Sequence, residues 1–210
     1  MARLSFIQLT ARSWKFLIVT AVLGALFAAL LSLSLPLEYS SAVRVLVIQP
    51  SATGFDPYTA IKSTERIATS LSELVYASTF FDNVMRQGQG FDPSYFPSQE
   101  NDKRKLWRKA LQLDVAAGTG IMTITAYHPV REQARILVDG VAKELALQTP
   151  NFFGSNVRVQ VIDSPLDSRW FTRPNFALNG SFGAFIGLLL GLAWMLWRST
   201  TSHRHVVEEE

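Results

Sequence analysis

The sequence of 210 residues contains no cysteine and only three histidines. Without cysteine, a disulfide framework and thiolate metal sites are excluded. His128 is the only histidine outside the C-terminal tail, and its position before Pro129 favours a turn or helix-capping role. No Gly-x-Ser-x-Gly or phosphate-loop pattern is present. The sequence therefore predicts no catalytic site, no metal and no cofactor, and we expect a non-enzymatic protein.

Charged residues are absent from two long stretches, Phe16 to Leu37 and Pro174 to Trp197. A helix rises about 1.5 Å per residue, so each stretch is long enough to cross the roughly 30 Å of membrane hydrocarbon. Each stretch therefore predicts a membrane-spanning helix. The first is longer than the apolar region of a signal peptide, which favours an uncleaved anchor.

The basic residues Arg3, Arg12 and Lys15 precede the first stretch, whereas Glu38 and only Arg44 follow it closely. By the positive-inside rule the N-terminus is expected in the cytoplasm, and two crossings return the C-terminus to the same side. The expected organisation is a cytoplasmic tail (1–15), a first span (16–37), an extracytoplasmic domain (38–173), a second span (174–197) and a second cytoplasmic tail (198–210).

Small residues recur at intervals of four in both predicted spans. Gly183, Gly187 and Gly191 lie on one face of the second span, and this spacing allows another helix to approach closely. A matching row in the first span consists of Ala21, Ala25 and Ala29. Two partners fit the glycine face: the first span of the same chain, or another protomer of an oligomer.

The segment between the spans has 136 residues, the size of one domain, and carries 15 Lys or Arg against 14 Asp or Glu. This balance gives no signal for nucleic-acid binding. Alternation predicts strands at 41–48, 111–117, 121–127 and 157–162, the first of them central and the middle two forming a hairpin. Helical spacing predicts four helices. The first covers 57–76 with Asp56 as its N-cap, and the second begins at the capping box Thr79-Phe-Phe-Asp82 and ends before Gly88. The third covers 98–110, and the fourth covers 130–148 and ends before Pro150.

These elements predict an α+β fold in which about four helices cover one face of a mostly antiparallel sheet of about four strands. Because the first strand leaves the membrane and the last one returns to it, we expect these two strands to pair antiparallel. The stretch between residues 87 and 98, which contains glycine and proline, is expected to be a loop.

A basic cluster lies in the helix expected at 98–110, and its members are Lys103, Arg104, Lys105, Arg108 and Lys109. One interpretation is a surface that contacts an anionic glycan, a lipid phosphate or the acidic face of a neighbouring protomer. The other is a solvated helix end, where cations complement the helix dipole. The sequence alone leaves both open.

Four segments of the sequence carry a resemblance to a known family. They are Tyr39-Ser-Ser-Ala-Val-Arg-Val-Leu-Val, Ser78-x-x-Phe-x-x-x-Met85, Tyr127-His-Pro-Val-Arg-Glu-Gln-Ala134, and Val159-Gln-Val-Ile-Asp-Ser-Pro165 followed by Arg173-Pro-Asn175. Over nearly its whole length the chain resembles the polysaccharide co-polymerases, or chain-length determinant (Wzz) proteins. Pro165, Pro174 and Asn175 match the proline-rich segment of that family.

The resemblance implies a homo-oligomeric scaffold of the bacterial inner (plasma) membrane, which acts with the polymerase or export machinery of capsule, exopolysaccharide or O-antigen biosynthesis. Only about eight residues separate the last expected helix from the last strand, so the chain resembles short members that lack the long helical hairpin. The alternative function is an adaptor that activates a separate cytoplasmic tyrosine kinase. All five tyrosines lie between the predicted spans, so the chain is not expected to be that kinase's substrate.

Overall fold

The computed structural model of the chain describes residues 13–49, 57–87, 90–154 and 156–204. These residues form two compact units. One is a domain, Glu38–Thr172, and the other is a helix pair built from the chain before Glu38 and after Thr172. The domain thus ends one residue before the expected boundary at Arg173.

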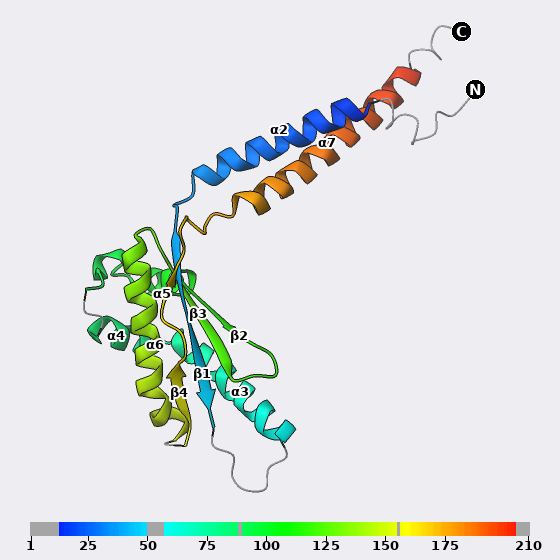
Figure 1. The fold of residues 1–210 in the computed structure, drawn as a ribbon. Helices are drawn as coiled ribbons and strands as arrows, with labels where there is room; N and C mark the ends of the chain where they lie inside the picture. The colour runs from blue at the N-terminus through cyan, green and yellow to red at the C-terminus, as the bar shows by residue number, and fades with distance from the viewer. Residues whose placement is uncertain (1–12, 50–56, 88–89, 155, 205–210) are drawn as a thin grey trace. The chain divides into compact units, whose positions relative to one another are not determined.

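The domain has an α+β fold built on an antiparallel sheet (Figure 1). Within the described residues its strands are β1 (Tyr39–Ile48), β2 (Leu111–Val115), β3 (Ile121–His128), β4 (Arg158–Val161) and β5 (Leu166–Asp167). The order is β2-β3-β1-β4, and β5 pairs with β1 beyond the end of β4. The expected hairpin is therefore confirmed as β2 and β3, which pair antiparallel.

The predicted central position of β1 is also confirmed, because β1 pairs with β3 along one edge and with β4 and β5 along the other. Its alternate residues Val43, Val45 and Val47 are at most 2% exposed, whereas Arg44 points to solvent. The first and last predicted strands pair antiparallel as expected, with Val45 opposite Val161. Strand β5 was not predicted, since two residues are too few to show a period.

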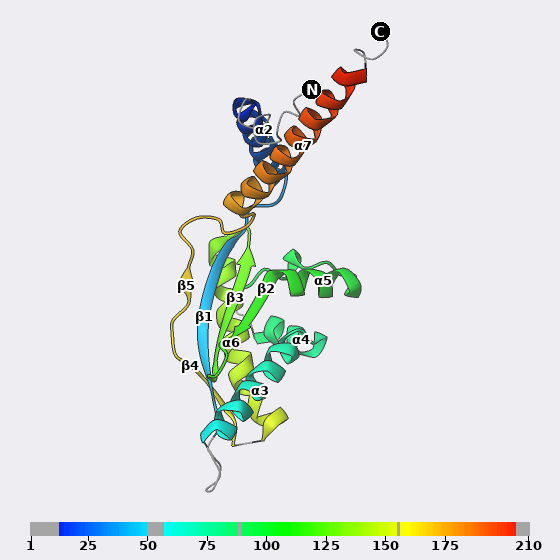
Figure 2. The ribbon, with the colours of Figure 1, turned by 90° about the vertical axis from the view of Figure 1, so that its right-hand side faces the viewer.

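Four α-helices belong to the described part of the domain: α3 (Pro57–Val75), α4 (Ser78–Gln87), α5 (Glu100–Ala110) and α6 (Arg131–Phe153). A short 3₁₀ helix, η1 (Pro93–Tyr95), lies in the stretch expected to be a loop. Helix α6 runs along the sheet in Figure 2 and packs against β1, β3 and β4. The core lies between the buried face of the sheet and these helices.

Two predicted helix starts were wrong. Helix α4 begins at Ser78, so Thr79 lies inside it and cannot cap it, and the Ser78 hydroxyl instead donates to Glu100 Oε1 at 3.0 Å. Helix α5 begins at Glu100, two residues later than expected. The predicted cap Asp56 lies outside the described residues.

The predicted stop of the last domain helix was also wrong, because α6 continues through Pro150 to Phe153. Proline lacks an N–H and therefore removes the hydrogen bond to the carbonyl four residues before it, yet three further residues of the helix follow Pro150. The Thr149 hydroxyl donates to the Leu145 carbonyl at 2.6 Å in the same turn. The helix ends at Gly154, whose φ of 81° favours a residue without a side chain.

The second unit consists of α2 (Trp14–Leu33) and α7 (Phe176–Arg204). Helix α2 and the Phe176–Arg198 part of α7 are long and apolar enough to cross a membrane. Helix α2 begins two residues before the first predicted span and ends four residues before its expected end. Helix α7 begins after Pro174 and extends beyond Trp197.

Candidate functional site

The face of α7 that contains the small residues is buried against α2 of the same chain. Gly183, Gly187 and Gly191 are buried. A Cβ added at Gly187 would meet the carbonyl oxygen of Thr20, and one added at Gly191 would meet the hydroxyl of Thr20. Within one chain, this face therefore contacts α2, the helix at the position of the first predicted span.

The matching row predicted in α2 is displaced by one residue. The atoms nearest to the three glycines belong to Leu17, Thr20, Gly24 and Ala28, and not to Ala21, Ala25 and Ala29. One of these contacts is glycine against glycine, since a Cβ on Gly24 would meet the carbonyl oxygen of Gly183. Adjacent helical residues are turned by about 100°, so the predicted alanine row lies beside the contact and remains partly exposed.

One end of the helix contact is polar. Asn179 Nδ2 donates to Ser32 Oγ at 2.8 Å, and Ser32 Oγ donates to the Ala28 carbonyl at 2.9 Å. Ser32 is only 3% exposed. Sequence reasoning missed this pair, although a serine and an asparagine inside two uncharged apolar runs were a usable signal.

The proline-rich segment leads the chain into α7. Asn175 Oδ1 accepts a hydrogen bond from the Leu178 N–H at 3.0 Å, so Asn175 caps the N-terminus of the helix. Pro174 precedes this cap, and its missing N–H removes no helical hydrogen bond because the helix has not yet begun. Pro165 belongs to the domain and is half-buried in the four residues that separate β4 from β5.

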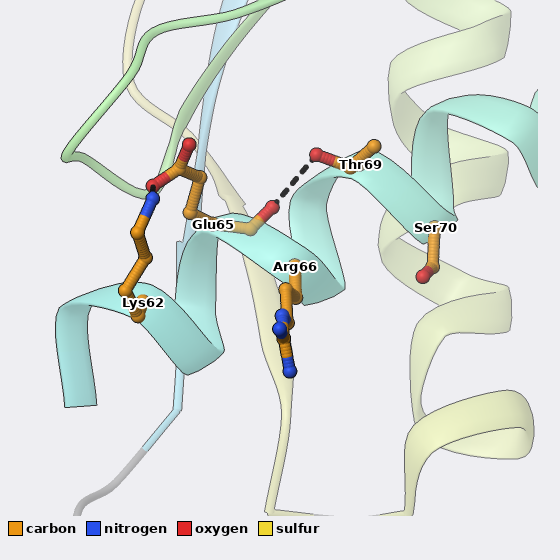
Figure 3. A pocket seen from close by; sticks show the side chains of 5 residues that line it. All are labelled: Lys62, Glu65, Arg66, Thr69 and Ser70. Carbon is orange, nitrogen blue, oxygen red and sulfur yellow. Dashed lines mark hydrogen bonds and ion pairs between the residues drawn. The ribbon is translucent and has the colours of Figure 1, made fainter. Parts of the chain in front are cut away.

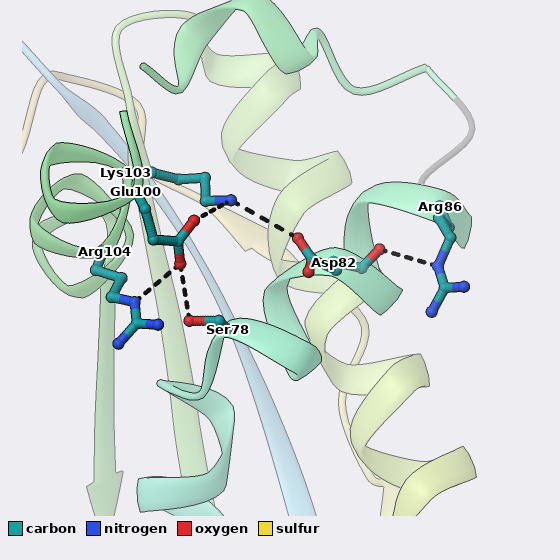
Figure 4. A network of polar contacts seen from close by, with 6 residues as sticks. All are labelled: Ser78, Asp82, Arg86, Glu100, Lys103 and Arg104. Carbon is teal, nitrogen blue, oxygen red and sulfur yellow. Dashed lines mark hydrogen bonds and ion pairs between the residues drawn. The ribbon is translucent and has the colours of Figure 1, made fainter. Parts of the chain in front are cut away.

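The basic cluster of α5 centres on Glu100 (Figure 4). The Glu100 carboxylate lies 2.6 Å from Lys103 Nζ and 2.8 Å from Arg104 Nε, and it accepts the Ser78 hydroxyl. These three contacts lower the pKa of Glu100 to about 2. Lys103 also lies 3.9 Å from Asp82, so the network joins α5 to α4.

The other three cations of the cluster also have partners within the chain. Lys105 lies 3.3 Å from Asp102, and Lys109 lies 3.5 Å from Glu38, which is buried. The guanidinium of Arg108 stacks over the ring of Tyr76. Because counter-charges or an aromatic ring already face these cations, the geometry favours a structural role for the cluster over a contact with an external anion.

His128 closes β3 and is 5% exposed. Its Nδ1 accepts the backbone N–H of Val130 at 2.9 Å, which is the turn contact expected next to Pro129. The rings of Phe91 and Tyr95 pack against the imidazole, and Nε2 is buried without a hydrogen-bond partner among the described residues. Burial lowers the pKa of His128 below its ordinary value of 6.5, although Glu38 and Asp92 act in the opposite direction.

We expect the free energy of unfolding to fall as the pH drops below about 6.5. The folded state holds His128 neutral while the unfolded state takes up its proton, so stability present above pH 6.5 is lost towards lower pH, by at most about 1.4 kcal/mol per pH unit. Thermal unfolding of the detergent-solubilised chain at pH 7.5 and 5.5 measures this slope. In His128→Asn, the amide oxygen can still accept from Val130 but does not titrate. An equal slope in this variant would show that another group is responsible.

A surface hollow and one buried carboxylate are two further polar features of the domain. A surface hollow of about 380 Å³ is lined by residues of α3 alone, as Figure 3 shows: Lys62, Glu65, Arg66, Thr69 and Ser70. Glu144 is fully buried in α6 and accepts a hydrogen bond from Gln148 at 2.9 Å. Within the described ranges, no group of three or more histidine, aspartate or glutamate side chains lies close enough to hold a metal ion.

No protein-family model matches this chain, and no curated protein matches it. The functional proposal therefore depends on the resemblance of the sequence segments and on the geometry of the sheet and of the helix pair.

Proposed function

We propose that the chain is a non-enzymatic, homo-oligomeric scaffold of the bacterial inner membrane, and that it acts in the biosynthesis of capsule, exopolysaccharide or O-antigen. The observation that carries the proposal is the order of its parts. An apolar helix leads into β1, and β4 pairs antiparallel with β1. The chain then passes through Pro174 and the cap Asn175 into a second apolar helix. The same order of parts led to the resemblance to polysaccharide co-polymerases.

Three tryptophans support a membrane position for the helix pair. Trp14, Trp194 and Trp197 are each more than half exposed. They share one end of the pair, because Leu17 lies beside Gly191 in the antiparallel contact. Tryptophan concentrates at the level of the lipid headgroups, so this end fits a membrane–water interface. Lys15 and Arg198 lie next to these tryptophans in the sequence and give this end the positive charge of a cytoplasmic side.

The topology can be tested with single cysteines, because the native chain has none. Lys105→Cys replaces a side chain that is 79% exposed in the domain, and Glu210→Cys marks the C-terminus. In intact spheroplasts a membrane-impermeant maleimide should label Lys105→Cys and should label Glu210→Cys only after lysis. The reverse pattern at either position would contradict the two-span topology.

The function itself is tested by deleting the gene in its host. We expect the amount or the chain length of a surface polysaccharide to change on gels, and the wild-type chain to restore it. The purified chain should also run as an oligomer in blue-native electrophoresis. Normal polysaccharide in the deletion strain would exclude the proposed function. A change confined to tyrosine phosphorylation of a separate kinase would instead favour the adaptor.

A further inference from the structure

A groove runs along the helix pair beside the glycine contact and encloses about 550 Å³. Its floor is formed by the small residues Gly24, Ala28, Gly183 and Gly187, where the two backbones touch. Long side chains such as Phe27, Leu31, Phe182 and Ile186 form the walls. The groove exists because the backbones are close while the large side chains on either side diverge.

The groove covers only part of the helix pair. Along α7 its lining extends from Asn179 to Leu190, twelve residues or about 16 Å of helix. This length is about half of the roughly 30 Å thickness of membrane hydrocarbon. Beyond it the contact is filled, because the side chains of Thr20 and Leu17 pack onto Gly191.

The polar pair Ser32 and Asn179 lies at one end of this groove, and both residues line it. The amide of Asn179 uses one N–H for Ser32, and its second N–H has no hydrogen-bond partner among the described residues. Asn179 follows the start of α7 by one turn, and Ser32 is in the last turn of α2. In a membrane this depth corresponds to the zone just below the headgroups, where the ester carbonyls of phospholipids lie.

We propose that this groove holds one phospholipid acyl chain, and that Asn179 donates to the ester carbonyl of that lipid. The proposal rests on the membrane position proposed above. An acyl chain fits because the groove has the length of one leaflet, apolar walls and a single hydrogen-bond donor at its headgroup end. A helix from a second copy of the chain fits less well, since the groove ends about halfway along the pair and the contact beyond it is filled.

Native mass spectrometry of the full-length chain tests the proposal. The protein, delipidated in detergent, is mixed with dioleoylphosphatidylglycerol and then activated by collisions until loosely bound lipid is removed. We expect one phospholipid per chain to remain on the wild type. Leu31→Trp should abolish this retention by filling the groove. Asn179→Leu should weaken it about tenfold, the scale of one lost hydrogen bond in an apolar site.

Two matched variants serve as controls. Leu189→Ala changes a partly exposed apolar residue that does not line the groove, and Ser181→Ala removes an exposed hydroxyl near Asn179. Both should retain the lipid as the wild type does. Equal retention in all variants, or a dimer that Leu31→Trp dissociates, would overturn the proposal. Circular dichroism confirms that each variant keeps its helices, so a loss of lipid is not mistaken for unfolding.

This result is independent of the polysaccharide phenotype. A chain that is inserted in the membrane but retains no lipid would contradict the groove proposal alone. A chain that labels from the wrong side in the cysteine experiment, or whose deletion leaves the polysaccharide unchanged, would contradict the proposed function.

Discussion

Gly187→Leu is expected to separate α2 from α7 while the domain stays folded. A side chain at this position would meet the Thr20 carbonyl and lie 3.2 Å from the Gly24 Cα, and backbone cannot move aside as a flexible side chain can. The helices would have to move apart along the whole glycine row. In lipid, where helix association depends on close packing, this loss has no hydrophobic compensation.

Disulfide formation between Ser32→Cys and Asn179→Cys measures this separation, because the two native side chains are in hydrogen-bond contact. We expect Gly187→Leu to slow crosslinking at least about fivefold, since forcing extra atoms into a packed contact costs about 1–3 kcal/mol. Leu189→Ala, on a partly exposed face, should leave the rate unchanged. Unchanged crosslinking in Gly187→Leu would mean that the glycine contact does not hold the helices together.

Trp107→Ala is expected to lower the free energy of unfolding of the domain by about 3–5 kcal/mol. Trp107 is 2% exposed, and its ring packs edge-on against Phe81 and lies 5.8 Å from Phe96 between ring centroids. Its indole N–H donates to the Val75 carbonyl at 2.8 Å, so the substitution also removes the partner of a buried acceptor. The side chain joins α5 to the end of α3 and to α4.

Denaturant unfolding followed by far-UV circular dichroism measures this loss. Trp170→Ala is the matched control, because Trp170 is 76% exposed and its loss should change stability by less than about 0.5 kcal/mol. Trp107→Phe should lie between the wild type and Trp107→Ala, since it keeps an aromatic ring but loses the hydrogen bond. A Trp107→Ala domain as stable as the control would show that α5 is not part of the cooperative core.

The sequence predicted those parts of the fold that have a strong local signal. The alternation of Val43, Val45 and Val47 fixed the position of β1, and the glycines at 118 and 120 marked the turn of the hairpin. The predicted stop at Pro150 was wrong because proline usually ends a helix, whereas three further residues of α6 follow it here. The start predicted from Thr79 was wrong because Thr79-x-x-Asp82 has the form of a capping box, whereas α4 begins one residue earlier at Ser78, whose hydroxyl donates to Glu100 of α5.

The candidate site was only partly predictable for a geometric reason. The four-residue spacing of the glycines showed which face of α7 carries small residues, and that face is buried in the structure. The rotational position of α2 depends on which residue permits the closest approach, and Gly24 permits a closer approach than Ala25. A helix pattern alone contains no information about that choice, because alanine and glycine count equally as small residues.

The central position of β1 has a consequence for the order of folding. Tyr39–Ile48 pairs with β3, which begins 73 residues after β1 ends, and with β4, which begins 110 residues after it. Contacts so distant in sequence form slowly because long loops must close first. Until these contacts form, both edges of the valine-rich strand β1 are unpaired, and unpaired strand edges promote aggregation. The nascent chain therefore must keep β1 from pairing with other chains until almost all of the domain has been synthesised.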